Sequence, residues 1–209
     1  MGRPVKFKDA IYQAASRLFG EQGLDGTSIR QIAESAGVSE AALYRHWAGK
    51  LDLAWAVFRS GLANLYANLE ERVRPDLAPY DAVRSAVECF YQLFDENYQL
   101  FSFVLLHQHD LWSRMDQVEE SPVRYWFDLM ARFVDKLPPE DAGNLDVLAA
   151  VTLGIVLQPA VAAVYGRPSP PMVPRSALVA RAVCRVLHID VPAQTVAVAP
   201  VPAATRVPA

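Results

Sequence analysis

Apolar residues recur at helical spacing along most of the chain, and the alternating patterns typical of β-strands are scarce. Near the N-terminus one set of apolar residues occupies positions i, i+3, i+4, i+7 and i+8, which form a single stripe on a helix: Ile11, Ala14, Ala15, Leu18 and Phe19. Gly20 and Gly23 follow this stripe, and we expect them to end the first helix.

Two short helices are predicted between residues 28 and 46. Ser28 and Gln31 have the spacing of a capping box, which opens a helix with an apolar inner face. That face comprises Ile29, Ile32, Ala33 and Ala36. Gly37 is expected to end this helix, because the residue after a helix often needs a positive φ. Ser39 is then a candidate cap for a third helix over residues 40–46.

Longer apolar periodicities follow, separated by proline and glycine. They predict helices over residues 51–73, 83–94, 98–108, 122–137, about 140–165 and 174–188, with an acidic loop over 110–120. Pro159 is expected to kink the helix over residues 140–165. Residues 190–209 are mainly Pro, Ala and Val without periodicity, which predicts a disordered tail. The fold class is therefore predicted to be all-α, with about nine helices.

The composition favours a folded protein with a large core, because 52% of the residues are hydrophobic and 21% are charged. Cys89 and Cys184 are too few for a disulfide framework and too far apart for a zinc ribbon, which favours a reduced, cytoplasmic setting. The sequence lacks the G-x-G-x-x-G, P-loop, G-x-S-x-G and H-E-x-x-H motifs. We therefore expect no enzyme activity, no catalytic residues and no cofactor.

Charge is distributed unevenly within the formal net charge of −3. Residues 1–50 contain seven Lys and Arg against five Asp and Glu, whereas residues 51–209 contain thirteen against eighteen. A basic N-terminal region of net charge +2 on an acidic remainder of −5 is compatible with nucleic-acid binding by the first fifty residues.

A membrane location is not expected. The first ten residues lack the apolar segment of a secretory signal. Residues 147–165 are nineteen residues without a charge, long enough to cross a bilayer, but they contain Gln158 and Pro159 and lack flanking basic clusters. A helix that is apolar on all sides can equally be buried in a protein core or between subunits.

The short helices around Gly37 have the arrangement of a helix-turn-helix, whose second helix presents its first residues to base edges in the DNA major groove. About forty residues here resemble the DNA-binding head of the TetR (tetracycline-repressor-like) family of bacterial transcriptional regulators. The resemblance is carried by Leu18-Phe19-x-x-x-Gly23, by Thr27-Ser28-Ile29-Arg30-Gln31-Ile32-Ala33-Glu34-Ser35-Ala36-Gly37-Val38-Ser39, and by Ala42-Leu43-Tyr44-x-His46-Trp47-x-x-Lys50. Trp47 stands where phenylalanine is more usual, and family members vary at the positions of Glu40 and Ala41.

The resemblance implies a homodimer that binds double-stranded operator DNA and is released by a small-molecule effector. The DNA contacts of the family carry over to Arg30, Ser39, Ala41, Ala42, Tyr44, His46 and Lys50. The arginine fork also suits guanine or phosphate, and the acidic Glu40 is expected to accept from a cytosine amino group or to point away from phosphate. The family's dimer surface corresponds to residues 146–165 and 174–188.

These implications divide the chain into a DNA-binding domain (1–50), a ligand-binding and dimerisation domain (51–189) and a tail (190–209). The middle domain is rich in aromatic residues, which suits a cavity for an apolar or aromatic ligand. The candidate ligand-binding residues are Phe101, Phe103, His107, Trp112, Tyr125, Trp126 and Met130. His107 and His109 resemble metal ligands, but residues i and i+2 face apart on a helix, so we expect no metal site.

The sequence thus favours a cytoplasmic, homodimeric transcriptional regulator, a repressor that binds a palindromic operator and is released by an apolar or aromatic ligand. One alternative is a small-molecule-binding α-bundle whose helix-turn-helix is vestigial. Another is an architectural DNA-binding protein without effector control, which predicts salt-sensitive binding with little sequence preference. The acidic remainder of the chain argues against the architectural protein.

Overall fold

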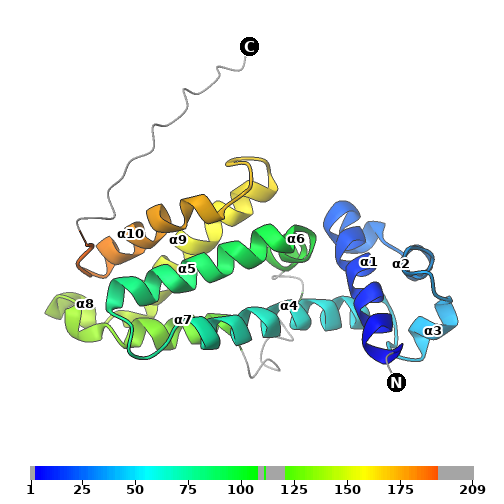
Figure 1. Cartoon of the computed structure of the whole chain (residues 1–209), viewed down its shortest axis with the longest axis horizontal. Helices are drawn as coiled ribbons and strands as arrows, with labels where there is room; N and C mark the ends of the chain where they lie inside the picture. The colour runs from blue at the N-terminus through cyan, green and yellow to red at the C-terminus, as the bar shows by residue number, and fades with distance from the viewer. Residues whose placement is uncertain (1–2, 108–110, 112–120, 193–209) are drawn as a thin grey trace, which may run out of the picture.

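The structure is a computed structural model that describes residues 3–107, 111 and 121–192, with side chains from residue 7 onward (Figure 1). These residues form ten α-helices and two short 3-10 helices, and no strand occurs among them. The predicted all-α fold is therefore confirmed. The helices are α1 (Arg3–Gly26), α2 (Ile29–Ala36), α3 (Glu40–Tyr44), α4 (Lys50–Arg72), α5 (Pro79–Glu96), α6 (Tyr98–His107), α7 (Pro122–Ala131), η2 (Val134–Lys136), α8 (Pro139–Ala142), α9 (Leu145–Val164), η3 (Val173–Arg175) and α10 (Ser176–Val186).

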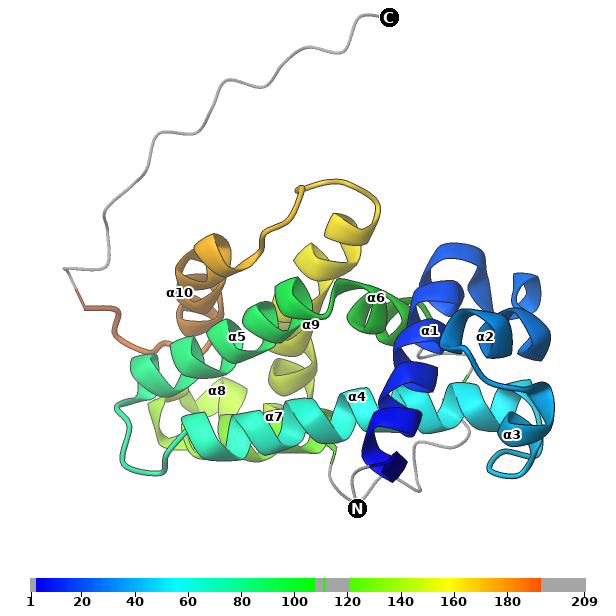
Figure 2. The same ribbon diagram turned by 45° about the vertical axis from the view of Figure 1, so that its right-hand side comes forward.

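Helices α1 to α3 and the first residue of α4, residues 3–50, are called the head here, and residues 51–192 the body. The head lies at one end of the molecule, at the right of Figure 1, and the body extends away from it. Helix α4 contains 23 residues and is therefore about 35 Å long. It runs from beneath the head along the body, as Figure 2 shows, so it connects the two regions mechanically.

Several predicted helix boundaries were wrong. Helix α1 continues through Gly20 to Gly26, and it leaves helical geometry only at Gly23, where φ is 71°. Helix α3 ends at Tyr44 rather than at residue 46, and the helix predicted over 122–137 is α7 followed by η2. The predicted helix over 140–165 is two helices, separated at Gly143 and Asn144. Pro159 lies inside α9, and η3 precedes α10, which begins at Ser176.

The buried apolar residues form two clusters. The head cluster joins the inner faces of α1 to α3 to the first half of α4, and it also includes Phe103 and Val104 of α6 and Leu111. The body cluster joins the second half of α4 to α5, α7, α9 and α10. Helices α4 and α6 therefore contribute to both cores, and α6 packs directly on α1.

Helix α9 is, of the described helices, the one long and apolar enough to cross a membrane. It packs on one side against α5, α6, α7 and α10, and 28% of its most apolar window is buried. Its outer side exposes large apolar side chains, and so does the neighbouring helix α10: Val147 (55% exposed), Val151 (48%), Tyr165 (73%) and Leu178 (58%). Helix α9 is thus half embedded in the body and half available to another apolar surface.

The segment between α9 and α10 is attached to α5 through a carboxylate. Both oxygens of Asp95 accept a hydrogen bond from the Met172 amide, at 2.7 and 2.8 Å, and Oδ2 also accepts from the Val173 amide at 2.8 Å. These bonds fix the start of η3, and with it the approach of α10 to α5.

Candidate DNA-binding surface and apolar cavity

The turn between α2 and α3 is set by the residues that the sequence singled out. Ser28 caps α2, and Gln31 returns the capping bond, with its side-chain oxygen 2.8 Å from the Ser28 amide. Gly37 has φ 67°, a left-handed conformation that glycine adopts without strain. Ser39 caps α3 by accepting from the Ala42 amide at 3.2 Å. The predicted caps and turn are confirmed, and together they fix the angle between the two helices.

Burial decides which residues of α2 and α3 face outward. Ile29, Ile32 and Leu43 are at most 8% exposed and belong to the head cluster. Thr27 locks the preceding turn, because its hydroxyl donates to the carbonyls of Leu18 and Gly23 at 3.1 and 2.8 Å. The opposite faces of both helices are thereby left for solvent or a partner.

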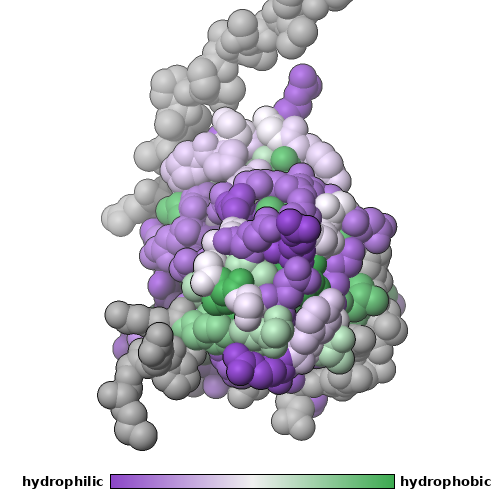
Figure 3. All heavy atoms as spheres, turned by 90° about the vertical axis from the view of Figure 1, so that its right-hand side faces the viewer, coloured by the Kyte–Doolittle hydropathy of each residue, from purple (hydrophilic) through white to green (hydrophobic). Residues whose placement is uncertain are grey.

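Most of the predicted DNA contacts lie on that outward side. Arg30, Ser39, Ala41, Tyr44 and His46 are exposed, Tyr44 by 56%, and Lys50 is half-buried at the start of α4. The face of the molecule in Figure 3, seen from the head end, is mainly hydrophilic with smaller apolar areas between. This combination of polar and apolar groups is suited to phosphates and base edges.

Ala42 and His46 differ from the other predicted contacts. Ala42 is 6% exposed, so its methyl group packs against the head, and its amide is already held by Ser39. The His46 ring lies between those of Phe7 and Trp47, with centroid distances of 5.6 and 5.5 Å. His46 is thus exposed and also in contact with two aromatic neighbours.

Arg45 was absent from the predicted contacts and is exposed at the C-terminal end of α3. Its position between Tyr44 and His46 was a signal that it could share their surface. A second arginine beside the predicted contacts increases the positive charge available to phosphates.

The body contains an apolar cavity of about 90 Å³ between α4, α5, α6, α7 and α9. Its lining carries no charged residue and comprises Phe58, Leu62, Leu65, Leu69, Ala86, Phe90, Phe101, Val104, Leu105, Pro122, Val123, Trp126, Leu153, Val156 and Leu157. Ligand sites for small molecules usually measure about 300–1,000 Å³. A ligand of that size would therefore have to move the cavity walls apart.

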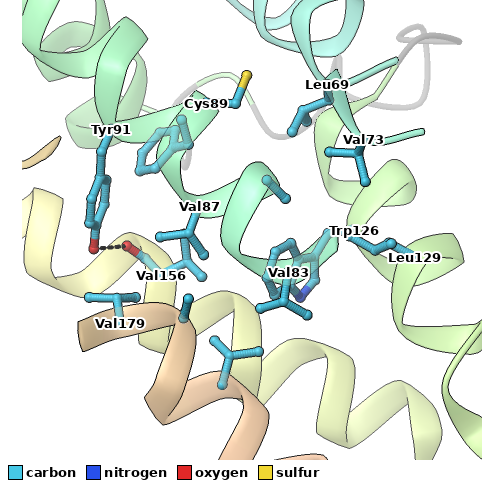
Figure 4. Close-up of a cluster of buried hydrophobic side chains, with 14 of the residues drawn as sticks. Leu69, Val73, Val83, Val87, Cys89, Tyr91, Trp126, Leu129, Val156 and Val179 are labelled. Atoms are coloured by element: carbon cyan, nitrogen blue, oxygen red, sulfur yellow. Dashed lines mark hydrogen bonds between the residues drawn. The ribbon is translucent and has the colours of Figure 1, made fainter. Parts of the chain in front are cut away.

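The polar groups of Trp126 and Tyr91 are hydrogen-bonded within the protein. The indole Nε1 of Trp126 donates to the Ala149 carbonyl at 3.2 Å and lies 3.1 Å from the Thr152 hydroxyl oxygen. The Tyr91 hydroxyl donates to the Val156 carbonyl at 3.1 Å, the bond drawn in Figure 4. The cavity thus offers apolar contact and little hydrogen bonding.

Two of the candidate ligand-binding residues, Phe101 and Trp126, line the cavity, and four others lie elsewhere. Phe103 faces the head, where its ring stacks on Phe19 with centroids 5.1 Å apart, and His107 contacts the Phe103 ring at 5.3 Å. Met130 is fully buried in the body cluster. Tyr125 lines a separate groove of about 410 Å³ between α4 and α7. Trp112 lies outside the described residues.

Neither cysteine has the properties of a reactive thiol. Cys89 and Cys184 are fully buried, and burial raises the pKa of each thiol to about 11. Both remain protonated at neutral pH, and the thiol is a poor nucleophile compared with the thiolate. Within the described ranges there is also no cluster of three His, Cys, Asp or Glu side chains that could hold a metal ion, and His109 lies outside them.

Comparison with known proteins gives the same picture of the head. Residues 11–57 match the family model described as bacterial regulatory proteins, tetR family. The chain is 27% identical to the HTH-type transcriptional activator FasR of Mycolicibacterium smegmatis over 123 residues, 57% of this chain and 56% of that protein. It is 29% identical to the HTH-type transcriptional repressor KstR2 of the same organism over 79 residues, 38% of each chain. The chain thus aligns with about half the length, or less, of these curated relatives.

Solved structures share the whole fold at low sequence identity. FadR from Bacillus subtilis, solved in complex with stearoyl-CoA, superposes with a TM-score of 0.75 at 15% identity, covering 87% of this chain and 99% of that one. KstR2 of Mycobacterium tuberculosis, a ketosteroid transcriptional regulator, superposes with a TM-score of 0.64 at 18% identity, covering 86% and 92%. The likeness therefore extends over both the head and the body.

Proposed function

We propose that this chain, a member of the tetR family of bacterial regulatory proteins through its N-terminal helices, is a cytoplasmic, homodimeric transcriptional repressor. In this account the head binds a palindromic operator, and an apolar or aromatic effector in the body releases it. The observation that carries the proposal is the pairing of an exposed recognition surface on α3 with an uncharged cavity bounded by α4, the helix that connects the two regions. The DNA-binding part is the head, and the ligand-binding and dimerisation part is the body.

Dimerisation is supported by the exposed apolar side of α9 and α10. Val147 and Val151 lie one helical turn apart on α9 and are 55% and 48% exposed, and the adjacent α10 exposes Leu178 by 58%. Exposed apolar residues that are grouped on one surface mark interaction sites. A two-fold contact through these helices would place two heads side by side. Recognition helices of such dimers bind half-sites about 34–36 Å apart, one turn of DNA.

The dimer is tested by placing a charge on that apolar side. Val151→Asp and Leu178→Asp should shift the protein to monomers in sedimentation-velocity experiments, because each carboxylate would be buried in the interface. Ala131→Asp, at an exposed position on α7, is the matched control and should stay dimeric. Unchanged sedimentation of both interface variants would contradict dimerisation through α9 and α10.

Effector control is supported by the position of the cavity. Phe58, Leu62 and Val104 line the cavity and also belong to the head cluster, so widening the cavity displaces residues that support the head. A ligand that prefers the widened form by a few kcal/mol is sufficient to empty the operator. The uncharged lining is compatible with a hydrocarbon chain, such as that of the stearoyl-CoA in complex with FadR, or with a ring system such as that of a ketosteroid, the class named in the description of KstR2 as a ketosteroid transcriptional regulator.

Effector control is tested by adding stearoyl-CoA or a ketosteroid to the protein–operator complex. Dissociation of DNA by either ligand, measured by fluorescence anisotropy, would support the proposal. Leu157→Asn, which places an amide in the cavity wall, should reduce the response while operator affinity stays the same. A protein that binds such ligands but no DNA at low salt would instead be a ligand-binding bundle with a vestigial helix-turn-helix.

A further inference from the structure

We propose that Arg17, on α1, is a positioning residue for DNA binding. It holds the C-terminal end of α2 through Ser35, and with it the turn that places α3. Arg17 is not among the predicted DNA contacts, and in this account it acts without touching DNA. The inference rests on the proposed function and adds to it a residue that fixes how the recognition helix is presented.

Helix α2 depends on its neighbours because it is short. It contains eight residues and packs on α1 and α3 (Figure 2). A helix of this length is unstable on its own in water. Its buried side chains are Ile29, Ile32 and Ala33. Apolar contacts are non-directional, so directional hydrogen bonds add to what these three side chains can fix.

Arg17 supplies such a bond at the end of α2. Its Nη2 donates to the Ser35 hydroxyl oxygen at 2.8 Å, and its Nη1 donates to Glu21 Oε2 at 3.2 Å. Ser35 is the last residue but one of α2. Glu21 lies one turn further along α1, so the ion pair holds the guanidinium in place while the other nitrogen reaches α2.

A second link joins α1 to the start of the same helix. The side-chain nitrogen of Gln31 donates to Gln22 Oε1 at 3.3 Å, and the side-chain oxygen of Gln31 accepts from the Ser28 amide in the capping box. Helix α1 thus contacts α2 through hydrogen bonds near both of its ends. A rotation of α2 on α1 therefore breaks at least one of these bonds.

The position of α2 determines the position of α3. The Val38 amide donates to the Ala33 carbonyl at 2.9 Å, which attaches the turn to the last turn of α2. Ser39, the cap of α3, follows directly. A tilt of α2 at Ser35 therefore moves α3 and the exposed Tyr44. Hydrogen bonds weaken steeply when their geometry is distorted, so such a tilt weakens the DNA contacts.

Helix α1 is itself held by the body. Gly20, three residues after Arg17, approaches the Gln99 backbone so closely that an added Cβ would lie 3.1 Å from the carbonyl oxygen. Arg17 and Ser35 line a groove of about 590 Å³ together with Asn97 and Gln99, where α5 meets α6. The bond between Arg17 and Ser35 therefore attaches α2 to a helix whose own position is set by the body.

The test is a double-mutant cycle on Arg17 and Ser35, measured as affinity for the operator that the full-length wild-type protein selects. Arg17→Ala and Ser35→Ala should each weaken operator binding by about three- to tenfold, the range for loss of one hydrogen bond. The double variant should bind no more weakly than the weaker single variant, because both substitutions remove the same bond. Ser35→Thr keeps the hydroxyl and should bind like the wild-type protein.

Arg84→Ala is the matched control, because it also removes an exposed arginine that pairs with a glutamate four residues on, Glu88 of α5. It should change operator affinity by less than about twofold. Circular-dichroism melting curves establish that each variant is folded. The slope of log affinity against log salt should be the same for Arg17→Ala as for the wild-type protein, because a positioning residue neutralises no phosphate.

A salt slope reduced by about 1 in Arg17→Ala would show that Arg17 contacts a phosphate and would overturn the inference. Additive losses in the double variant, or unchanged affinity in both single variants, would overturn it as well. Hydrogen exchange measures the same link without DNA: the α2 amides should exchange faster in Arg17→Ala and Ser35→Ala than in Arg84→Ala. Equal exchange would contradict the attachment of α2 by Arg17. If the wild-type protein selects no inverted repeat, the proposed function itself fails, whatever the exchange shows.

Discussion

The head and the body are both helical and share α4 and α6, yet their interiors are filled differently. In the head cluster the Phe103 ring stacks on Phe19 and meets Phe58 edge-on, with centroids 5.1 and 6.4 Å apart. In the body an uncharged cavity of about 90 Å³ lies between five helices. A closely packed core holds DNA contacts at fixed positions, whereas unfilled space allows an interior to be reshaped by a ligand.

The boundary between the two regions is itself closely packed. A Cβ added to Gly61 of α4 would lie 3.2 Å from Val104 of α6, and one added to Gly20 of α1 would lie 3.1 Å from the Gln99 carbonyl oxygen. Helix α6 therefore approaches both α1 and α4 more closely than most side chains at these two glycine positions would allow without a shift of their neighbours. The two interiors are thus joined by close contacts of α6 with α1 and α4.

The largest expected effect comes from truncating one buried leucine in each of the two cores. Leu43→Ala in the head and Leu93→Ala in the body remove buried side chains, 1% and 5% exposed, and each should lower the free energy of unfolding by about 2–5 kcal/mol. Urea denaturation measures this loss. Of the two variants, only Leu43→Ala should also weaken operator binding, measured for the fraction of molecules that is folded. Equal loss of operator affinity in both variants would mean that the head has no core of its own.

The buried thiols make the stability of the body depend on pH in the alkaline range. Because burial raises the pKa of Cys89 and Cys184 from 9.0 to about 11, their contribution to stability is present below pH 9 and is lost as the pH rises toward 11. The free energy of unfolding should fall by at most about 2–3 kcal/mol for each thiol.

This prediction is checked by urea denaturation at pH 8 and pH 10.5, with Cys89→Ala and Cys184→Ala as comparison variants. Each variant should lose less stability over this pH interval than the wild-type protein. Rapid reaction of both thiols with Ellman's reagent in the folded protein at pH 8 would contradict their burial.

Asp95 tests the attachment of the α9–α10 segment to the body. Asp95→Ala leaves the amides of Met172 and Val173 without their acceptor, which should lower the free energy of unfolding by about 1–3 kcal/mol. Asp135→Ala, at an exposed position in η2, should change it by less than about 0.5 kcal/mol. Equal melting temperatures of the two variants would show that the hydrogen bonds to Asp95 contribute little to stability.

The smallest effect concerns phosphate contacts on the head. Lys50→Ala should weaken binding to all DNA sequences alike and reduce the slope of log affinity against log salt by about 1. Tyr44→Ala should also weaken binding without changing sequence preference. Lys136→Ala removes an exposed lysine in the body and is the control for the loss of one positive charge. An unchanged salt slope for Lys50→Ala would exclude that lysine from the interface.

The structure of the head could be predicted because its signals are local. The capping box at Ser28, the left-handed Gly37 and the Ser39 cap are each defined by residues within three positions of one another. Local steric and hydrogen-bonding rules therefore gave the two helices and the turn. The end of α1 was misplaced because Gly20 is accommodated within a helix that packs against the Gln99 backbone.

The cavity could not be predicted in the same way because it depends on contacts between distant segments. Helix α6 is apolar on nearly every side, so its sequence does not indicate that Phe101 faces the cavity while Phe103 faces the head. Their separation of two positions places them on different sides of the helix. Only the arrangement of α1, α4 and α9 around α6 assigns each side its neighbour.

The account is tested most directly by selecting random DNA duplexes with the purified full-length protein at two salt concentrations. It predicts an enriched inverted repeat with half-sites about one turn, 34–36 Å, apart, still preferred at the higher salt. Binding at low salt without enrichment of any sequence would contradict it and indicate an architectural DNA-binding protein. Absence of binding at both salt concentrations, in protein freed of any co-purified ligand, would contradict it as well.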